Sequence, residues 1–202
     1  MLQEHSLKGW DQYFSRANVY GADRGHYKSN RILWCDQSNI TSIQQLAKLR
    51  TWDVIIDDAS HIPSHQLSTF LTLFPKLSAG GIYIIEDIET SYWADSSRLY
   101  GYDICSSKPC TESIVQQFAA AIDLVNRPIS SPSGCRLHGH RDVVFTPEID
   151  AMIGSVSFIH NAVIVRKHPD GHTPRSSRYR MEGCICGHGC SNMCQNGCLN
   201  NG

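Results

Sequence analysis

Two short apolar runs, each ended by acidic residues, most constrain how this chain folds. Val54 to Ile56 is followed by Asp57 and Asp58, and Ile82 to Ile85 is followed by Glu86 and Asp87. Both runs are too short for a helix, and the first contains no polar residue, which is typical of parallel strands buried on both faces. The sequence therefore predicts two buried strands with acids at their carboxyl ends.

A helix is predicted between the two strands. Apolar side chains recur there at helical spacing: Leu67, Phe70, Leu71 and Phe74. Pro63 suits the first helical turn, where its missing N–H costs nothing. Pro75 and the pair Gly80-Gly81 then end the helix and turn the chain. The whole stretch predicts a strand, a helix and a second, parallel strand.

The acids of the two strand ends are expected to meet. With a right-handed crossover the carboxyl ends of both strands open onto one edge of the sheet, where α/β sheets bind ligands. Asp58, His61, Glu86 and Asp87 then converge, and three carboxylates together are costly unless a cation neutralises them. An all-oxygen site for Mg²⁺, with His61 as a base beside it, meets this need. The alternative is that Asp57 and Asp58 cap the following helix and the other acids are solvated.

Composition narrows the classes of partner and compartment. The 202 residues suit one domain, with 41% hydrophobic and 18% charged residues. The formal net charge of −1 gives no indication of a nucleic acid or a membrane surface as partner. No apolar run reaches the length of a transmembrane helix, no signal-peptide core precedes the first helix, and scattered body cysteines such as Cys35 fit a reducing compartment. A cytoplasmic protein is expected.

The remaining pattern predicts an α/β fold. Helices are expected over Leu2–Phe14, from Ile43 to Leu49 and from Ile114 to Val125, and strands over Val19–Ala22, ending in Asp23, and Arg31–Cys35. Residues 94–110 are predicted to form a loop over the site, with Tyr92 and Trp93 either walling a pocket or packing on the sheet. Val156–Ile159 and Ala162–Val165 flank His160-Asn161 as an antiparallel hairpin at the sheet edge.

The carboxyl-terminal segment differs from the body of the chain. Residues 168–180 are polar and basic, and disorder is predicted there. Five cysteines follow at the spacing Cys-x-Cys-x3-Cys-x3-Cys-x3-Cys, from Cys184 to Cys198. A zinc or copper(I) site is one interpretation. Low-complexity sequence is the other, because the paired Cys-x2-Cys knuckles of structural zinc sites are absent. The predicted domains are residues 1–167 and a disordered Cys-rich tail over 168–202.

These motifs resemble a known family of enzymes. The segments Asp53–His61, Phe74–Asp87 and Thr90–Trp93 resemble the metal-dependent class I S-adenosylmethionine methyltransferases, in particular the macrolide sugar O-methyltransferases of the mycinamicin and macrocin type. Supporting matches are Ser6-Leu7 with Trp10, Tyr20–Asp23, and Asp36–Asn39. The resemblance covers about residues 5–167 and implies a Rossmann-like methyltransferase sheet with helices on both faces and a carboxyl-terminal antiparallel hairpin.

The resemblance implies a role for each matching residue. Asp58, Glu86 and Asp87 would be the Mg²⁺ ligands, and His61 the base that deprotonates a hydroxyl of a sugar or similar small molecule. S-adenosylmethionine would supply the methyl group. Asp23 would bind the cofactor ribose and Asp36-Gln37 would lie beside the adenine, with Asp57 also on the cofactor side.

The chain also departs from the family pattern. The family's first strand and the Gly-rich loop that holds the cofactor have no counterpart before the first helix. The family's helical region linked to oligomer formation has no counterpart either. The sequence therefore does not decide whether the chain forms a homo-oligomer, and a homo-oligomer stays an open alternative. A truncated chain with poor cofactor affinity is expected. A gap in the sheet, or an unusual strand pairing, should then lie between the strands that follow residues 18 and 53. The alternatives to an enzyme are an inactive methyltransferase-fold protein with a binding or scaffolding role, and a soft-metal binder that works through its tail.

Overall fold

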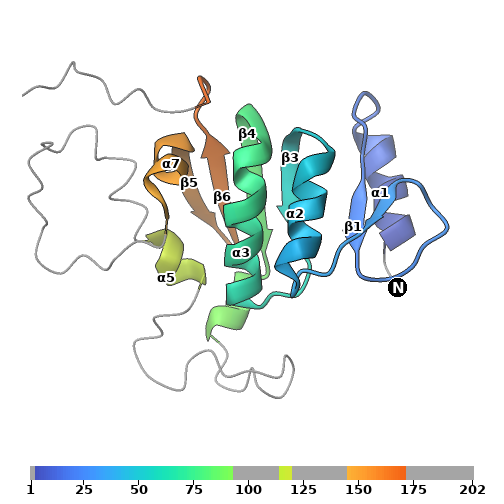
Figure 1. Ribbon diagram of the computed structural model, residues 1–202, viewed down its shortest axis with the longest axis horizontal. Helices are drawn as coiled ribbons and strands as arrows, with labels where there is room; N and C mark the ends of the chain where they lie inside the picture. The colour runs from blue at the N-terminus through green and yellow to red at the C-terminus, as the bar shows by residue number, and fades with distance from the viewer. Residues whose placement is uncertain (1–2, 93–113, 120–144, 172–202) are drawn as a thin grey trace, which may run out of the picture.

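The computed structural model describes residues 3–92, 114–119 and 145–171 (Figure 1). Four predicted features lie outside these residues: Trp93, the loop over 94–110, the second half of the helix that begins at Ile114, and the Cys-rich tail. The helices and strands are α1 (Gln3–Tyr13), β1 (Gly21–Asp23), β2 (Ile32–Trp34), α2 (Ile40–Leu49), β3 (Trp52–Asp57), α3 (Pro63–Leu73), β4 (Leu77–Glu86), α5 (Ile114–Ala119), α7 (Pro147–Met152), β5 (Ile153–Ile159) and β6 (Ala162–Lys167), with 3₁₀ turns over Phe74–Lys76 and Ile88–Tyr92.

The main sheet has four strands in the order β3-β4-β6-β5. Strands β3 and β4 are parallel, with Asp57 opposite Ile85, so the predicted strand–helix–strand unit is confirmed. Strand β6 runs antiparallel to both β4 and β5. The predicted hairpin is therefore also confirmed, and its turn at His160-Asn161 lies at the same end of the sheet as Glu86, which pairs with Ala162.

Strands β1 and β2 form a separate parallel pair. Strand β1 begins at Gly21, two residues later than predicted, and includes Asp23. In the described part of the chain no ladder joins β1 to β3, in agreement with the expected gap. The two sheets meet instead through side chains: the rings of Tyr20 and Trp52 lie edge to face at 6.0 Å, and the Arg50 guanidinium lies 3.9 Å above Tyr20.

The core lies on one face of the four-stranded sheet. Helices α2 and α3 lie side by side in front of β3 and β4 (Figure 1). Phe70 of α3 is fully buried at the centre of an aromatic cluster, with its ring centroid 4.7 to 5.6 Å from those of Phe74, Phe118, Tyr83 and Phe145. This cluster joins α3, β4, α5 and the segment before α7, and so it fixes the helix that begins next to the predicted site.

The expectation that β3 is buried on both faces is wrong. Val54 and Ile56 are 52% and 39% exposed. They alternate with Ile55 and Asp57, which point into the core side. The apolar run of β3 therefore has one face packed on the core and one exposed face.

Two further features concern the helices. The six-residue helix α7 has no counterpart in the sequence prediction, because a helix of fewer than two turns leaves little periodic signal. No helix in the described ranges has the length and apolar character needed to cross a bilayer.

Candidate functional site

The site is built on the two loops that follow β3 and β4. The first loop leaves β3 at Asp57 and enters α3 at Pro63, which occupies the first helical turn as predicted. The second loop leaves β4 at Glu86 and enters the 3₁₀ turn at Ile88. His61 in the first loop and Asp87 in the second both have left-handed backbones, with φ of 56° and 53°. The parallel pairing of β3 and β4 brings the two loops to the same edge of the sheet.

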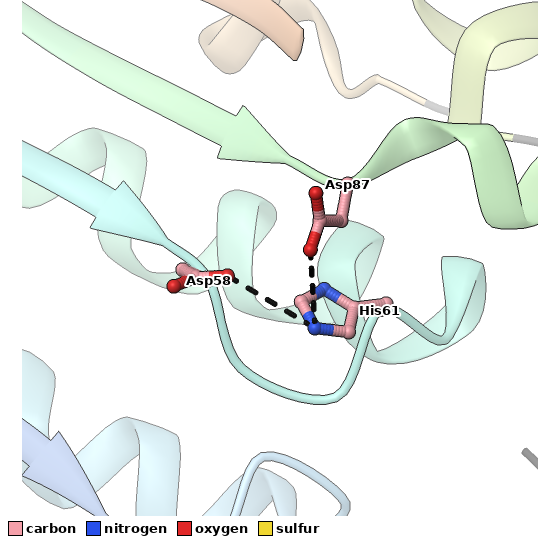
Figure 2. A group of neighbouring side chains, drawn as sticks. All are labelled: Asp58, His61 and Asp87. Carbon is pink, nitrogen blue, oxygen red and sulfur yellow. Dashed lines mark ion pairs between the residues drawn. The ribbon is translucent and has the colours of Figure 1, made fainter. Parts of the chain in front are cut away.

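Three of the four predicted metal-site residues come together at this edge. Figure 2 shows the imidazole of His61 between the carboxylates of Asp58 and Asp87. His61 Nε2 lies 4.0 Å from Asp58 Oδ1 and 3.7 Å from Asp87 Oδ2. One ligand atom from each residue lies within 4.8 Å of the others, close enough to share one cation. Asp58 is the most exposed of the three, so the site opens to solvent on its side.

Glu86 lies beside this group but is not one of the three residues whose ligand atoms come together. It ends β4, and its backbone carbonyl accepts a hydrogen bond from Nε2 of the buried Gln66 on α3 at 3.1 Å. Partial burial raises the pKa of its carboxyl, and repulsion from Asp58 and Asp87 adds to this effect. The structure thus places Glu86 next to the site, as the neighbour of Asp87.

The electrostatics of the site favour a cation. Partial burial raises the pKa of Asp58 above its ordinary value, and repulsion from Asp87 adds to the shift against the opposing effect of His61. Partial burial also raises the pKa of Glu86, with repulsion from Asp58 and Asp87 as further causes. A divalent cation would remove this repulsion, and carboxylate oxygens are the ligands that Mg²⁺ prefers. The donor set therefore fits a hard divalent metal.

A partly buried hydrogen-bond network holds the first loop against the end of β3. Gln37 Nε2 donates to both carboxylate oxygens of Asp57, at 2.7 and 2.8 Å, and its Oε1 accepts from the Ser60 backbone N–H at 3.0 Å and the Ser60 hydroxyl at 2.6 Å. The Tyr83 hydroxyl donates to Asp57 at 3.3 Å. Gln37 and Asp57, predicted to face the cofactor, thus hold the loop that carries Asp58 and His61.

The other two residues predicted to bind a cofactor lie nearer the amino terminus. Asp23 ends β1, and its Oδ1 accepts from the Gly25 backbone N–H at 2.6 Å. Asp36 follows β2, and its Oδ1 accepts from the Ser38 backbone N–H and hydroxyl at 2.9 and 2.7 Å. Asp36 lies beside Gln37 in the chain and so beside the network, whereas Asp23 lies on the separate two-stranded sheet.

The sequence prediction gave no role in the site to two of its polar residues, Thr90 and Asn161. Thr90 is fully buried, and its hydroxyl lies 2.9 Å from the His61 carbonyl oxygen and 3.3 Å from that of Asp87, so it links the two loops. Asn161, in the β5–β6 turn, bonds to the Asp87 carboxylate. The sequence marked Asn161 only as a turn residue, and nothing in the pattern indicated that its turn reaches the acids.

Stability should depend on pH through Asp57. The carboxyl is 5% exposed, and burial raises its pKa from 3.8 to about 6, against the lowering effect of Gln37 and Tyr83. The folded chain then holds this proton more tightly than the unfolded chain, so the free energy of unfolding falls as pH rises from about 4 to about 6. A shift of about two units corresponds to about 3 kcal/mol. Urea unfolding of metal-free protein at pH 4 and pH 7.5 should show this loss in the wild type and a clearly smaller one in Asp57→Asn, which keeps the raised pKa values of Asp58 and Glu86.

Asp36→Asn is the matched control for this measurement. Hydrogen bonds from Ser38 lower the pKa of Asp36, so its contribution to stability is lost as pH falls, the opposite sign. If Asp57→Asn and the wild type had the same dependence on pH, the carboxyl of Asp57 would not carry the raised pKa.

Comparisons with known proteins place this geometry in context. No protein-family model matches the chain. The chain is 41% identical to the 8-demethyl-8-α-L-rhamnosyl tetracenomycin-C 2′-O-methyltransferase of Streptomyces olivaceus, over 50% of this chain and 29% of that relative. It is 29% identical to the mycinamicin VI 2″-O-methyltransferase of Micromonospora griseorubida, over 80% of this chain and 39% of that relative. The chain thus spans less than half the length of the curated relatives that it matches.

Solved structures show the same likeness. The MycE methyltransferase of the mycinamycin biosynthetic pathway, in complex with Mg and SAH, superposes with a TM-score of 0.62 and 27% identity, over 81% of this chain and 40% of that one. A second MycE structure also contains mycinamycin VI and superposes with a TM-score of 0.60. The predicted α/β, Rossmann-like methyltransferase fold is confirmed. In both sequence and fold, this chain is similar to the S-adenosylmethionine-dependent sugar O-methyltransferases of the mycinamicin and macrocin type.

Proposed function

We propose that this chain carries the metal-binding and proton-accepting part of an S-adenosylmethionine-dependent, Mg²⁺-assisted O-methyltransferase. Its acceptor is a hydroxyl of a sugar or a similar small molecule. The observation that carries the proposal is the convergence of Asp58, His61 and Asp87 within 4.8 Å at the end of two parallel strands. The likeness to MycE, whose structures contain Mg, SAH and a mycinamycin, supports both the metal and the class of substrate.

Each residue of the site has a distinct task in this proposal. Asp58 and Asp87 would hold the cation. Glu86, the chain neighbour of Asp87, would be the third acidic ligand, although its carboxylate is not among the groups that already converge. When bound, Mg²⁺ would lower the pKa of an acceptor hydroxyl. His61 Nε2, which faces both carboxylates, accepts the proton from that hydroxyl. S-adenosylmethionine, if bound, would supply its sulfonium methyl group to the deprotonated oxygen and leave as the neutral thioether S-adenosylhomocysteine. Holding the two reactants in line would supply part of the acceleration.

The cofactor is proposed to lie on the β1–β2 side of the site. Asp23 would accept hydrogen bonds from the ribose hydroxyls, a common role of an acid at the end of the second strand of a nucleotide-binding sheet. Asp36 and Gln37 would lie beside the adenine. Gln37 hydrogen-bonds both to Asp57 and to Ser60. The same network therefore holds the residues proposed to face the cofactor and the loop that carries Asp58 and His61.

Methyl transfer to sugar-bearing acceptors tests the proposal. The chain is incubated with S-adenosylmethionine and a panel of glycosylated and free sugars, with Mg²⁺ or with EDTA. We expect transfer that requires a divalent cation and that is lost in Asp58→Asn. Asp53→Asn, at the other end of β3, is the matched control. Transfer that persisted in EDTA and in Asp58→Asn would show that the metal site is not part of the reaction.

A non-catalytic role is the second candidate, and the interruption of the sheet favours it. Asp23 lies on the two-stranded sheet and Asp58 follows the edge strand of the four-stranded one, with no ladder between β1 and β3 in the described ranges. In this case the chain would bind a divalent metal without binding the cofactor. Calorimetric titration with SAH separates the two roles: saturable binding supports the enzyme, and metal binding alone supports the second candidate.

A further inference from the structure

We propose that Asn161 is a positioning residue of the metal site: its side-chain amide fixes the orientation of the Asp87 carboxylate. Asn161 lies in the β5–β6 turn, 74 residues beyond Asp87 in the chain. The inference rests on the proposed function, because it assumes that Asp87 is a metal ligand. It adds the β5–β6 hairpin to a site otherwise made from the loops after β3 and β4.

Both ends of the amide are used. Nδ2 donates to Asp87 Oδ1 at 2.7 Å, and Oδ1 of Asn161 accepts from the Glu89 backbone N–H at 2.9 Å. The Asn161 backbone carbonyl also accepts from the Ile88 N–H at 3.4 Å. The turn therefore hydrogen-bonds both to the side chain of Asp87 and to the backbone of the next two residues.

The hydrogen bond from Asn161 determines which carboxylate oxygen of Asp87 faces the site. Asn161 occupies Oδ1, and it is Oδ2 that lies 3.7 Å from His61 Nε2. A carboxylate whose one oxygen is bonded from behind loses its rotational freedom and presents the other oxygen in one direction. Partners of this kind orient ligands and raise metal affinity.

The backbone of the turn explains why asparagine suits the position. Asn161 has a φ of 59°, and the three non-glycine residues with left-handed backbones in the described ranges are His61, Asp87 and Asn161. Asparagine tolerates this conformation. Glycine would meet the need of the backbone but has no amide, and aspartate would keep the size but place a second carboxylate against Asp87. These two substitutions therefore distinguish the effect of the turn conformation from the effect of the hydrogen bond to Asp87.

The test is to measure Mn²⁺ binding to the 202-residue chain by titration calorimetry. We expect Asn161→Gly to bind Mn²⁺ about 10- to 100-fold more weakly than the wild type, with an unchanged circular dichroism spectrum and a melting temperature no lower than that of the wild type. Asn161→Asp should also bind more weakly, and it replaces the glycine variant if that one fails to fold. His160→Ala, at the exposed neighbouring turn position, should keep the wild-type affinity.

The outcomes distinguish the inference from the function on which it rests. If the wild type binds Mn²⁺, Asp58→Asn does not, and the folded Asn161 variants bind as the wild type does, the inference fails while the metal site stands. If variants of Asn161 lose stability but not affinity, the residue serves the hairpin alone and the inference fails. If the wild type binds no Mn²⁺, both the inference and the proposed metal site fail.

Discussion

The His61→Asn variant is expected to lose methyl transfer by about 10²- to 10⁴-fold in kcat, the usual contribution of a positioned general base. The substitution removes the only group that the proposal gives for accepting the hydroxyl proton. Asparagine is chosen because it tolerates the left-handed backbone of residue 61, with its φ of 56°. The loss should therefore reflect chemistry and not a distorted loop, and initial rates at saturating cofactor and acceptor measure it.

The control for His61→Asn is the same change at His168. His168 follows β6 at the end of the sheet opposite to the site, since its neighbour Lys167 pairs with Ile153 and Ala162 pairs with Glu86. His168→Asn should keep the wild-type rate. A further check is pH: raising pH should partly restore the rate of His61→Asn, because hydroxide from solution replaces the base. If His61→Asn turned over as fast as the wild type, another group would have to remove the proton.

Replacing Phe70 by alanine should lower the free energy of unfolding by about 3–5 kcal/mol, the range for deleting a buried phenylalanine. The ring is fully buried and contacts four other aromatic rings, so its loss leaves a cavity that rigid neighbours fill poorly. Small domains have about 5–15 kcal/mol of stability in total. The variant therefore loses a large share of it, and chemical denaturation measures the loss.

Phe158→Ala is the matched control for the core. Phe158 is 42% exposed on β5, so the same deletion there should cost far less than at Phe70. Because α3 begins just after His61, the loosened helix in Phe70→Ala should also weaken Mn²⁺ binding. Equal losses of stability in the two variants would mean that the aromatic cluster is not the centre of the core.

The sequence was most informative where a pattern and a topology rule act together. The apolar runs before Asp57 and Glu86 predicted the strands, and the parallel crossover predicted that four residues would meet: Asp58, His61, Glu86 and Asp87. All but Glu86 bring a ligand atom into one group. Local patterns cannot show what lies across the sheet. Val54 and Ile56 look like core residues because the composition of a strand does not reveal whether both of its faces are covered.

The supporting residues were beyond the reach of the sequence for a similar reason. Gln37 and Asp57 carry polar groups that suit a cofactor, but their bonds to each other depend on how β2 and β3 are placed. Asn161 reaches Asp87 only through the antiparallel pairing of β4 and β6. Tertiary pairing, which spans more than 70 residues in this case, leaves no trace in local periodicity.

The left-handed backbones of His61, Asp87 and Asn161 have an energetic consequence. Each such conformation costs on the order of 1 kcal/mol or more when the residue has a side chain. Glycine at these three positions would make the apoprotein easier to fold and, at the same time, poorer at holding an ion. The chain loses some stability to hold His61 and Asp87 toward the site, with Asn161 bonded to the far oxygen of Asp87. Selection for thermal stability alone is expected to replace these residues first.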